Sequence, residues 1–425
     1  MENVGYRKSC YIAEKVMVVL IYQSLNKIFY KDESNYLCEY KKRFSSAFTK
    51  HFDIEIKQFN HKNAYPAFLC YTEEMVCLLE KIYLANQELL ALLPAVPNVI
   101  IKQFYLLCVI DEVKASNDIE GNHSTRRELR EAMEDIDDKN RFVSTMKKYK
   151  MMKPGLKMDF STPEALRKFY DDFAHKEVVI DNPRNALDGK LFRRDSVDVD
   201  SGTGRTVHRG VYPEKKIIEY LKRALDIFNG DNMPVLVRMA VFHYIFAYIH
   251  PFYDGNGRTA RFMASYAMLE HIHPMACLRL STSINKNKAK YYKMFANTDA
   301  EINRGDLTPF VLEFLEFVLQ SIIDTKRLLS RKLTQYNENT HILDKITNDE
   351  LTLKIYILLF QASVLYGQGI TVSKLESELK KSRNTIMDRL KKIPPEYLFI
   401  HTVKKVKYYK LNLLILKNNR EKVEG

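Results

Sequence analysis

Hydrophobic residues recur at three- and four-residue spacing along much of the chain, and this periodicity predicts a mainly α-helical protein. The clearest run extends from Pro234 to Ile249 and comprises Val235, Leu236, Met239, Phe242, Ile245, Phe246 and Ile249. Pro251 ends this helix, because a residue that precedes a proline is pushed out of the helical region. A second helix is predicted to begin near Arg258, with hydrophobic residues at Phe262, Met263, Tyr266 and Leu269. The chain between the two helices is therefore a short loop.

Two other stretches alternate hydrophobic and polar positions, as strands do. Residues 191–212 place Val197 and Val199 among polar residues around the turn-forming Ser201–Gly204, which predicts a β-hairpin. Residues 397–411 alternate in the same way, and they follow three predicted helical segments at residues 349–366, 371–379 and 382–393. Both hairpins are small additions to a helical fold.

The loop between the two central helices gathers groups that suit phosphate chemistry. Residues 250–261 contain a titratable base, a carboxylate, two glycines and two arginines: His250, Asp254, Gly255, Gly257, Arg258 and Arg261. Residues 254–257 lead into a helix N-terminus, where free backbone N–H groups and the helix dipole favour an anion. Singly, a histidine at a helix end, a glycine turn or two arginines on a solvated face are ordinary structural features. Their combination predicts a site that holds a polyphosphate against a base.

This stretch resembles the signature of the Fic family, H-x-F-x-[D/E]-G-N-G-R-x-x-R, with every defining position filled, and the resemblance extends over about residues 100–325. It implies a helical catalytic core that transfers AMP from ATP to a hydroxyl side chain of a protein. By this resemblance His250 would be the general base, which suits a histidine because it titrates near neutral pH. Asp254 would hold Mg²⁺, which needs only one or two carboxylates when phosphate oxygens complete its ligands.

The same resemblance implies roles for the rest of the motif. The backbone around Gly255, Asn256 and Gly257 would form an anion hole, and Arg258 and Arg261 would meet the outer phosphates. Amides and guanidinium groups suit phosphoryl chemistry, because catalysis there depends mainly on positioning and charge stabilisation.

Residues outside the motif also resemble parts of the family. Tyr292, in the pair Tyr291-Tyr292, and Asn303, which opens the segment 303–311, would line the adenine pocket. A core aromatic and a helix cap are the structural alternatives for these two. The hairpin predicted over residues 191–212 would be the family's flap, which holds an extended target segment by strand addition. Its expected docking residues are Val207, His208 and Gly210.

Ser116-Asn-Asp-Ile-Glu120-Gly121 matches the family's inhibitory helix motif, [S/T]-x-x-x-E-[G/N]. Ser116 and Glu120 are four residues apart, so on a helix they share one face, and Gly121 is a natural helix stop. In the family this glutamate pairs with the second arginine of the catalytic motif, here Arg261, and takes the space of the γ-phosphate. The resemblance therefore implies an intramolecular brake, although the short motif by itself is frequent by chance.

Composition limits the remaining possibilities. The chain has 425 residues, of which 46% are hydrophobic, so it is long enough for two or three domains with substantial cores. The six cysteines lack C-x-x-C spacing, and no G-x-x-x-x-G-K-[S/T] loop is present, which argues against zinc, a disulfide framework and a P-loop. Residues 11–30 are too charged for a signal peptide or membrane span and predict a buried amphipathic helix. We expect a cytoplasmic protein without a membrane partner.

The formal net charge of +13 raises the question of a polyanionic partner. Lysines and arginines gather over residues 380–410, where helix, helix, helix and hairpin resemble a winged helix-turn-helix. Its outward residues would be Arg383, Asn384, Thr385 and Arg389. Such a module contacts DNA through its recognition helix and wing, or serves in dimerisation and protein docking.

We therefore expect three regions: a mostly helical segment at residues 1–95, a Fic catalytic domain at 96–330 and a winged helix at 345–415. The inhibitory helix is expected around residues 105–121. The leading hypothesis is an autoinhibited protein adenylyltransferase that uses ATP and Mg²⁺ and modifies a target protein or itself. The alternatives are a DNA-binding regulator whose core only senses nucleotide, and a Fic enzyme that uses another donor or removes AMP. The oligomeric state is open, with a homodimer preferred.

Overall fold

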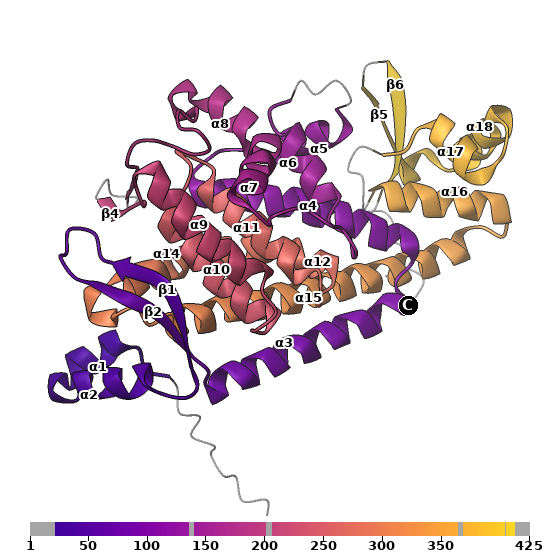
Figure 1. Ribbon diagram of the computed structural model, residues 1–425. Helices are drawn as coiled ribbons and strands as arrows, with labels where there is room; N and C mark the ends of the chain where they lie inside the picture. The colour runs from indigo at the N-terminus through magenta and orange to yellow at the C-terminus, as the bar shows by residue number, and fades with distance from the viewer. Residues whose placement is uncertain (1–21, 136–139, 201–205, 364–368, 404, 413–425) are drawn as a thin grey trace, which may run out of the picture.

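Figure 1 shows the computed structural model of the chain, which describes residues 22–135, 140–200, 206–363, 369–403 and 405–412. Within these residues the fold is mainly helical, with three antiparallel sheets of two strands each, so the predicted fold class is confirmed. Most of the amphipathic helix expected at residues 11–30 lies outside the described residues. Residues 22–24 are not helical, and α1 (Leu25–Lys31) begins after its cap Ser24 and has Leu25 as its buried residue.

The N-terminal region contains a hairpin that the helical periodicity did not predict. It follows α1 and α2 (Glu33–Phe44) and consists of β1 (Thr49–Lys57) and β2 (Ala64–Cys70), paired antiparallel. Phe52, Ile54 and Ile56 alternate with exposed neighbours and pack into the main core. The expectation of a mostly helical N-terminal segment was therefore wrong for this hairpin, although its period-two alternation is present in the sequence.

The two long helices α3 (Glu73–Leu92) and α15 (Thr308–Ile346) pack against each other (Figure 1). α15 has 39 residues, and α3 continues through the short η1 (Leu93–Ala95) into α4 (Asn98–Glu120). α4 is buried over much of its length and contacts α11, α12, α13 and α15. It ends at Gly121, which adopts a left-handed conformation with φ of 81°. This end presents the last turn of α4 to the centre of the fold.

The centre of the fold is α10 (Val235–Ile249), which is buried on nearly every side between α9 (Glu214–Asn229), α11 (Asn256–Met268) and α15. This burial explains why its hydrophobic residues are not confined to one face. The remaining helices of the core are α5 (Arg126–Glu134), α6 (Val143–Lys150), α7 (Pro163–Tyr170), η2 (Asp171–His175), α8 (Lys176–Asp181), η3 (Pro183–Asn185), α12 (Pro274–Cys277), α13 (Leu280–Lys286), α14 (Lys288–Asp299) and η4 (Glu301–Asn303).

The hairpin predicted before α9 is present as β3 (Asp198–Asp200) and β4 (Thr206–Arg209), which pair antiparallel. Its turn, residues 201–205, lies outside the described residues. Gly210 follows β4 directly, and the N–H of Val211 donates to the carbonyl of Ile249 at 3.0 Å. The base of the hairpin is therefore joined to the end of α10.

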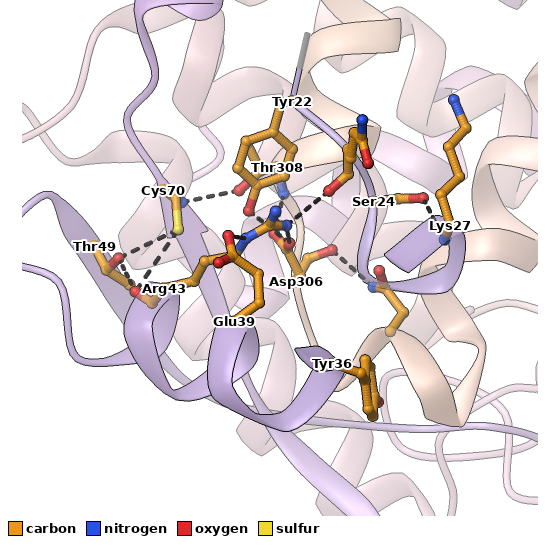
Figure 2. A network of polar contacts seen from close by, with 12 residues as sticks. Tyr22, Ser24, Lys27, Tyr36, Glu39, Arg43, Thr49, Cys70, Asp306 and Thr308 are labelled. Atoms are coloured by element: carbon orange, nitrogen blue, oxygen red, sulfur yellow. Dashed lines mark hydrogen bonds and ion pairs between the residues drawn. The ribbon is translucent and has the colours of Figure 1, made fainter. Parts of the chain in front are cut away.

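A polar network attaches the N-terminal region to the start of α15, as Figure 2 shows. The carboxylate of Asp306 is fully buried and accepts from the Tyr22 hydroxyl at 2.7 Å and the Thr308 N–H at 2.9 Å. Arg43 lies 3.6 Å from the same carboxylate, and its guanidinium covers the Tyr22 ring. Burial raises the pKa of Asp306 despite these hydrogen bonds. The network holds together segments that are more than 250 residues apart.

The C-terminal region has a hydrophobic cluster of its own. It is built from α16 (Glu350–Gln361), α17 (Val372–Leu379), α18 (Arg383–Lys392), η6 (Pro395–Tyr397) and the hairpin of β5 (Leu398–Val403) and β6 (Val406–Leu411). The predicted helix over residues 349–366 is present as α16 up to Gln361 and continues with π-helical geometry at Ala362 and Ser363, whereas residues 364–368 lie outside the described residues. Ser382 caps α18 as the sequence indicates, since its hydroxyl accepts from the N–H of Thr385.

Among the described residues, no helix is long and apolar enough to cross a membrane. Five cysteines carry free thiols (Cys38, Cys70, Cys77, Cys108 and Cys277), while Cys10 lies outside the described residues. The described part of the chain also contains no cluster of three or more His, Cys, Asp or Glu side chains suited to a metal ion. A metal at a single carboxylate there would need further ligands from a bound molecule.

Candidate functional site

The turn between α10 and α11 is held by side chains of the motif itself. α11 begins at Asn256, two residues earlier than predicted, because Gly255 in a left-handed conformation (φ 82°) serves as its N-cap. The buried Asn256 side chain accepts from the Phe252 N–H at 2.9 Å and donates to the Phe252 carbonyl at 2.8 Å. Asn256 therefore stabilises the turn with its side chain, and only its backbone is left to face a ligand.

His250 is the C-cap of α10 and has a left-handed backbone, with φ of 53° and ψ of 61°. Its Nδ1 lies 3.2 Å from the carbonyl of Ala247. A carbonyl can only accept, so the neutral ring carries its proton on Nδ1 and leaves the lone pair on Nε2. Burial, and then the charge of His208, lower the pKa of His250 to about 3, while the carboxylate of Asp254 acts in the opposite direction. The imidazole is thus neutral near pH 7 and able to accept a proton at Nε2.

The N-terminus of α11 is covered by Glu120, from the last turn of α4. A Cβ placed on Gly257 would overlap Oε1 of Glu120 and would come within 2.8 Å of Nη1 of Arg261. Only a residue without a side chain allows the carboxylate to approach the helix so closely. Glu120 therefore occupies the position at which the free N–H groups of the helix favour an anion.

Arg261 is completely buried and is held from α4. Its Nη1 lies 2.7 Å from Oε1 of Glu120, and its Nε and Nη2 donate to the Ser116 hydroxyl and carbonyl at 3.1 and 2.9 Å. Burial acts against the charge, but the Glu120 carboxylate together with Tyr291 and Tyr149 outweighs it, and the pKa of Arg261 is raised. Ser116 and Glu120 thus meet the same guanidinium, as their four-residue spacing indicates.

Arg258 connects two carboxylates, one of which the sequence did not reveal. Its Nη1 donates to Glu177 at 2.6 Å and its Nη2 to Asp254 at 3.2 Å. Both Arg258 and Glu177 are 2% exposed, so the arginine is not part of a solvated face. Asp254 also accepts from the N–H of Gly255, and 31% of its side chain remains exposed. Asp254 is accordingly the carboxylate of this pair that can reach a bound metal.

Tyr292 and Asn303 have different surroundings. Tyr292 is 46% exposed, and its hydroxyl donates to the carbonyl of Ile119, in the last turn of α4, at 2.6 Å. Asn303 is 1% exposed, and its amide donates to the carbonyls of Thr298 and Asp306. The structure therefore brings Tyr292 beside the helix that carries Glu120, whereas the Asn303 side chain stabilises the chain between α14 and α15. For Asn303 these contacts favour the structural alternative over a place in the pocket.

The three residues expected on the flap, Val207, His208 and Gly210, also differ in exposure. Val207 is 42% exposed on β4. His208 is buried, with Nε2 at 2.7 Å from the carbonyl of Tyr248, so it fastens the strand to α10. Gly210 lies against the site itself, because a Cβ there would come within 3.0 Å of the His250 Cβ. Of the three, only Val207 presents its side chain to the surface.

Sequence reasoning missed Glu177, Arg193 and Tyr170. Tyr170 stacks on Phe252 with ring centroids 3.6 Å apart and donates to the carbonyl of Asp254 at 3.0 Å. Arg193 donates to the carbonyl of His250 at 2.8 Å. None of the three stands in a motif or at a distinctive spacing, so no local signal identifies them.

Comparison with known proteins identifies the part of the chain that carries the motif. Residues 162–268 match the model of the Fic/DOC family. This stretch includes the residues from His250 to Arg261 together with Glu177, but it excludes Ser116, Glu120, Tyr292 and Asn303.

The chain is 32% identical over 144 residues to "Protein adenylyltransferase fic-1" of Caenorhabditis elegans, and the matched segment is 32% of this chain and 26% of that protein. It is 25% identical over 203 residues to "Protein adenylyltransferase Fic" of Drosophila melanogaster, and the matched segment is 45% of this chain and 37% of that protein. The chain thus spans about a quarter to two fifths of the length of these relatives. A crystal structure of a Fic family protein from Desulfovibrio desulfuricans G20 superposes with a TM-score of 0.49 at 20% identity, over 80% of this chain and 97% of that one.

Proposed function

We propose that this chain, a Fic/DOC family protein distantly related to the protein adenylyltransferases, transfers AMP from ATP to a hydroxyl side chain of a protein. One observation carries the proposal. A neutral imidazole with its lone pair on Nε2 ends α10, and the free N–H groups of α11 begin six residues later, at Asn256, next to the close-packed Gly257. A proton acceptor and an anion site are thereby built into one short turn.

The reaction that suits this turn is a displacement at the α-phosphorus. The acceptor hydroxyl gives its proton to Nε2 of His250, and its oxygen forms a bond to that phosphorus. The bond from the α-phosphorus to the bridging oxygen breaks, and pyrophosphate leaves. The N–H groups of residues 255–257 and the guanidinium of Arg261 stabilise phosphate charge.

Asp254 is the residue that would hold Mg²⁺, since its carboxylate is partly exposed beside the phosphate site. Bound there with phosphate oxygens, the ion would neutralise part of their charge. Arg258 lies against the same carboxylate and is held on its other side by Glu177, so it limits the positions that the Asp254 side chain can take.

We further propose that the contact between Glu120 and Arg261 is a brake. The carboxylate lies on Gly257 and uses the guanidinium that would otherwise meet an outer phosphate. ATP can bind fully only when Glu120 leaves, because two anions cannot share the helix N-terminus. The last turn of α4 is therefore the part that has to move.

Labelling with α-labelled ATP tests the enzyme proposal. Purified Glu120→Gly protein with Mg²⁺ should label itself or added proteins more strongly than the wild type. The matched control is Glu120→Gly with His250→Ala, which should bind ATP equally well and transfer nothing. Equal labelling by these two variants would exclude His250 as the base, and equal labelling by wild type and Glu120→Gly would exclude the brake. Labelled UTP and γ-labelled ATP, run in parallel, separate AMP transfer from the other nucleotide and phosphate donors.

We propose that residues 345–415 form a winged helix-turn-helix that binds a second macromolecule, and two observations bear on its nature. Arg383 and Asn384 are exposed at the start of α18, which suits contact with a DNA groove. The hairpin of β5 and β6 exposes the apolar side chains Phe399, Ile400, Val403 and Val406, which suits contact with a protein, a second copy included. The regulator hypothesis requires salt-sensitive duplex binding without His250-dependent labelling. Sedimentation of Phe399→Ser beside the wild type tests the homodimer.

A further inference from the structure

Arg193 is an arginine without an acidic partner in the interior of the protein. Its side chain is completely buried, and no ion pair is found for it among the described residues. Burial lowers the pKa of Arg193 to about 10, because the charged form loses its hydration. Removing a charge from water costs several kcal/mol unless hydrogen bonds compensate, so the contacts of such a group are informative.

All of its hydrogen bonds go to backbone carbonyls in two places. Nε donates to His250 at 2.8 Å, and Nη2 approaches Ile249 at 3.3 Å, so one side holds the end of α10. Nη2 also donates to Val211 at 2.8 Å and Nη1 to Asp195 at 2.5 Å. Asp195 precedes β3 and Val211 follows β4, so the other side closes the base of the flap.

The surroundings of Arg193 keep this arrangement tight. The carboxylate of Glu214 accepts from the backbone N–H groups of Lys190, Leu191 and Phe192 at 3.0, 2.6 and 2.8 Å, which fixes the chain just before Arg193. On the other side, a Cβ on Gly210 would overlap Nη2 of Arg193. The guanidinium is thus enclosed between a fixed segment and the flap.

The carbonyl that Nε holds belongs to His250, whose backbone is left-handed. This conformation is unfavourable for a residue with a Cβ, so it persists only where the surroundings enforce it. If the His250 backbone left this conformation, the change in φ would redirect its Cβ, and the imidazole and its Nε2 would turn with it. A hydrogen bond from a charged donor opposes that rotation.

We propose that Arg193 is a positioning residue that joins the flap to His250, so that a hydroxyl held along the flap arrives at Nε2. The inference rests on the proposed function above. Arg193 touches neither the acceptor nor the nucleotide, and it acts through the backbone of His250, Ile249 and Val211. Its loss therefore misplaces the base relative to the acceptor while the N-terminus of α11 stays intact.

The test uses Arg193→Lys and Arg193→Met in full-length Glu120→Gly protein. Lysine keeps the charge but not the planar fork, so it cannot serve both groups of carbonyls. We expect the rate of self-labelling at saturating ATP to fall about 10- to 100-fold, the scale expected from a displacement of about 1 Å. The dissociation constant for a fluorescent ATP analogue should change less than about twofold.

Arg279→Lys is the matched control, since Arg279 is a buried arginine that contacts neither the flap nor α10 in the described structure. It should lose thermal stability without losing labelling rate per folded molecule. Gly210→Ala is a second probe, because the added methyl group overlaps Nη2 and also comes within 3.0 Å of the His250 Cβ, and its labelling rate should fall at least as far as that of Arg193→Lys.

An NMR measurement separates the failure of this inference from the failure of the proposed function. In ¹⁵N-histidine-labelled protein, the His250 resonances should show a protonated Nδ1 in the parent, and Arg193→Lys should mix the two tautomers. If the parent never labels, the enzyme proposal fails and the tautomer shift alone decides the positioning role. Arg193→Lys with the parent's labelling rate and tautomer, or with a loss no larger than that of Arg279→Lys, would overturn the inference.

Discussion

The proposed brake has two physical components, charge and volume, which substitutions of Glu120 can separate. The carboxylate forms an ion pair with Arg261, with Oε1 2.7 Å from Nη1, and it fills the space on Gly257. Glu120→Gln keeps the volume and removes the charge, whereas Glu120→Gly removes both. If both components exclude ATP, its affinity should increase from wild type to glutamine to glycine.

The size of each step follows from the contact. A hydrogen bond to a charged group contributes about 1.5–3 kcal/mol and a neutral one about 0.5–1.5 kcal/mol. The Glu120 side chain is 29% exposed, so we take a difference of about 1 kcal/mol for glutamine, or roughly fivefold tighter binding. Glycine removes the whole contact and its volume, about 2–3 kcal/mol, which corresponds to roughly 30- to 150-fold.

Calorimetry with a non-transferable ATP analogue and Mg²⁺ measures these affinities directly. Glu131→Gln is the control, because it makes the same chemical change at a carboxylate that is 57% exposed on α5, and it should leave the affinity unchanged. If glutamine bound the analogue as tightly as glycine, volume would play no part. If glutamine matched the wild type, charge would play none. If neither variant bound more tightly than wild type, the displacement argument would be refuted.

Three further predictions concern groups around the site. Burial lowers the pKa of His243 from 6.5 to about 3, so below pH 6.5 the unfolded chain binds a proton that the folded chain does not, and the free energy of unfolding falls. In urea unfolding, His243→Gln should therefore lose about 2 kcal/mol less than wild type between pH 7 and 5. Equal losses for the two proteins would contradict this prediction. Tyr292→Phe removes the hydrogen bond to the Ile119 carbonyl in the last turn of α4, which contributes about 1 kcal/mol, so self-labelling should rise up to about fivefold. Unchanged labelling would show that this bond does not hold Glu120 in place. Glu177→Gln leaves the buried Arg258 without its main counter-ion, so it should lower the free energy of unfolding by roughly 3 kcal/mol. It should also raise the Mg²⁺ concentration needed for labelling. A free energy of unfolding equal to that of wild type would show that the ion pair of Glu177 and Arg258 does not stabilise the fold.

The parts of the site that follow from local spacing could be predicted from the sequence. Pro251 after a helical run and the glycines at 255 and 257 predict one turn, and the backbone of that turn fixes where the N-terminus of α11 lies. Ser116 and Glu120 share a helix face because they are four residues apart, and in the structure both contact Arg261. These relations need no knowledge of distant segments.

Local spacing also misled where two patterns overlap or a side chain can turn inward. The period-two alternation of Phe52, Ile54 and Ile56 is in the sequence, yet the surrounding helical composition hid the β1–β2 hairpin. Asn303 has a position that suits a pocket, but its amide is used by the carbonyls of Thr298 and Asp306. The choice between ligand and backbone as partner depends on what lies opposite the side chain.

Local spacing alone therefore predicts a helical fold, a base close to a helix N-terminus, and a glutamate on the same face as Ser116. The contacts of Glu177 with Arg258 and of Arg193 with His250 depend on packing, which brings together residues 81 and 57 positions apart. Such pairs have no fixed spacing, since the path of the intervening chain is set by the burial of hydrophobic side chains. The reactive side chains follow from local sequence, and their relative positions depend on the fold.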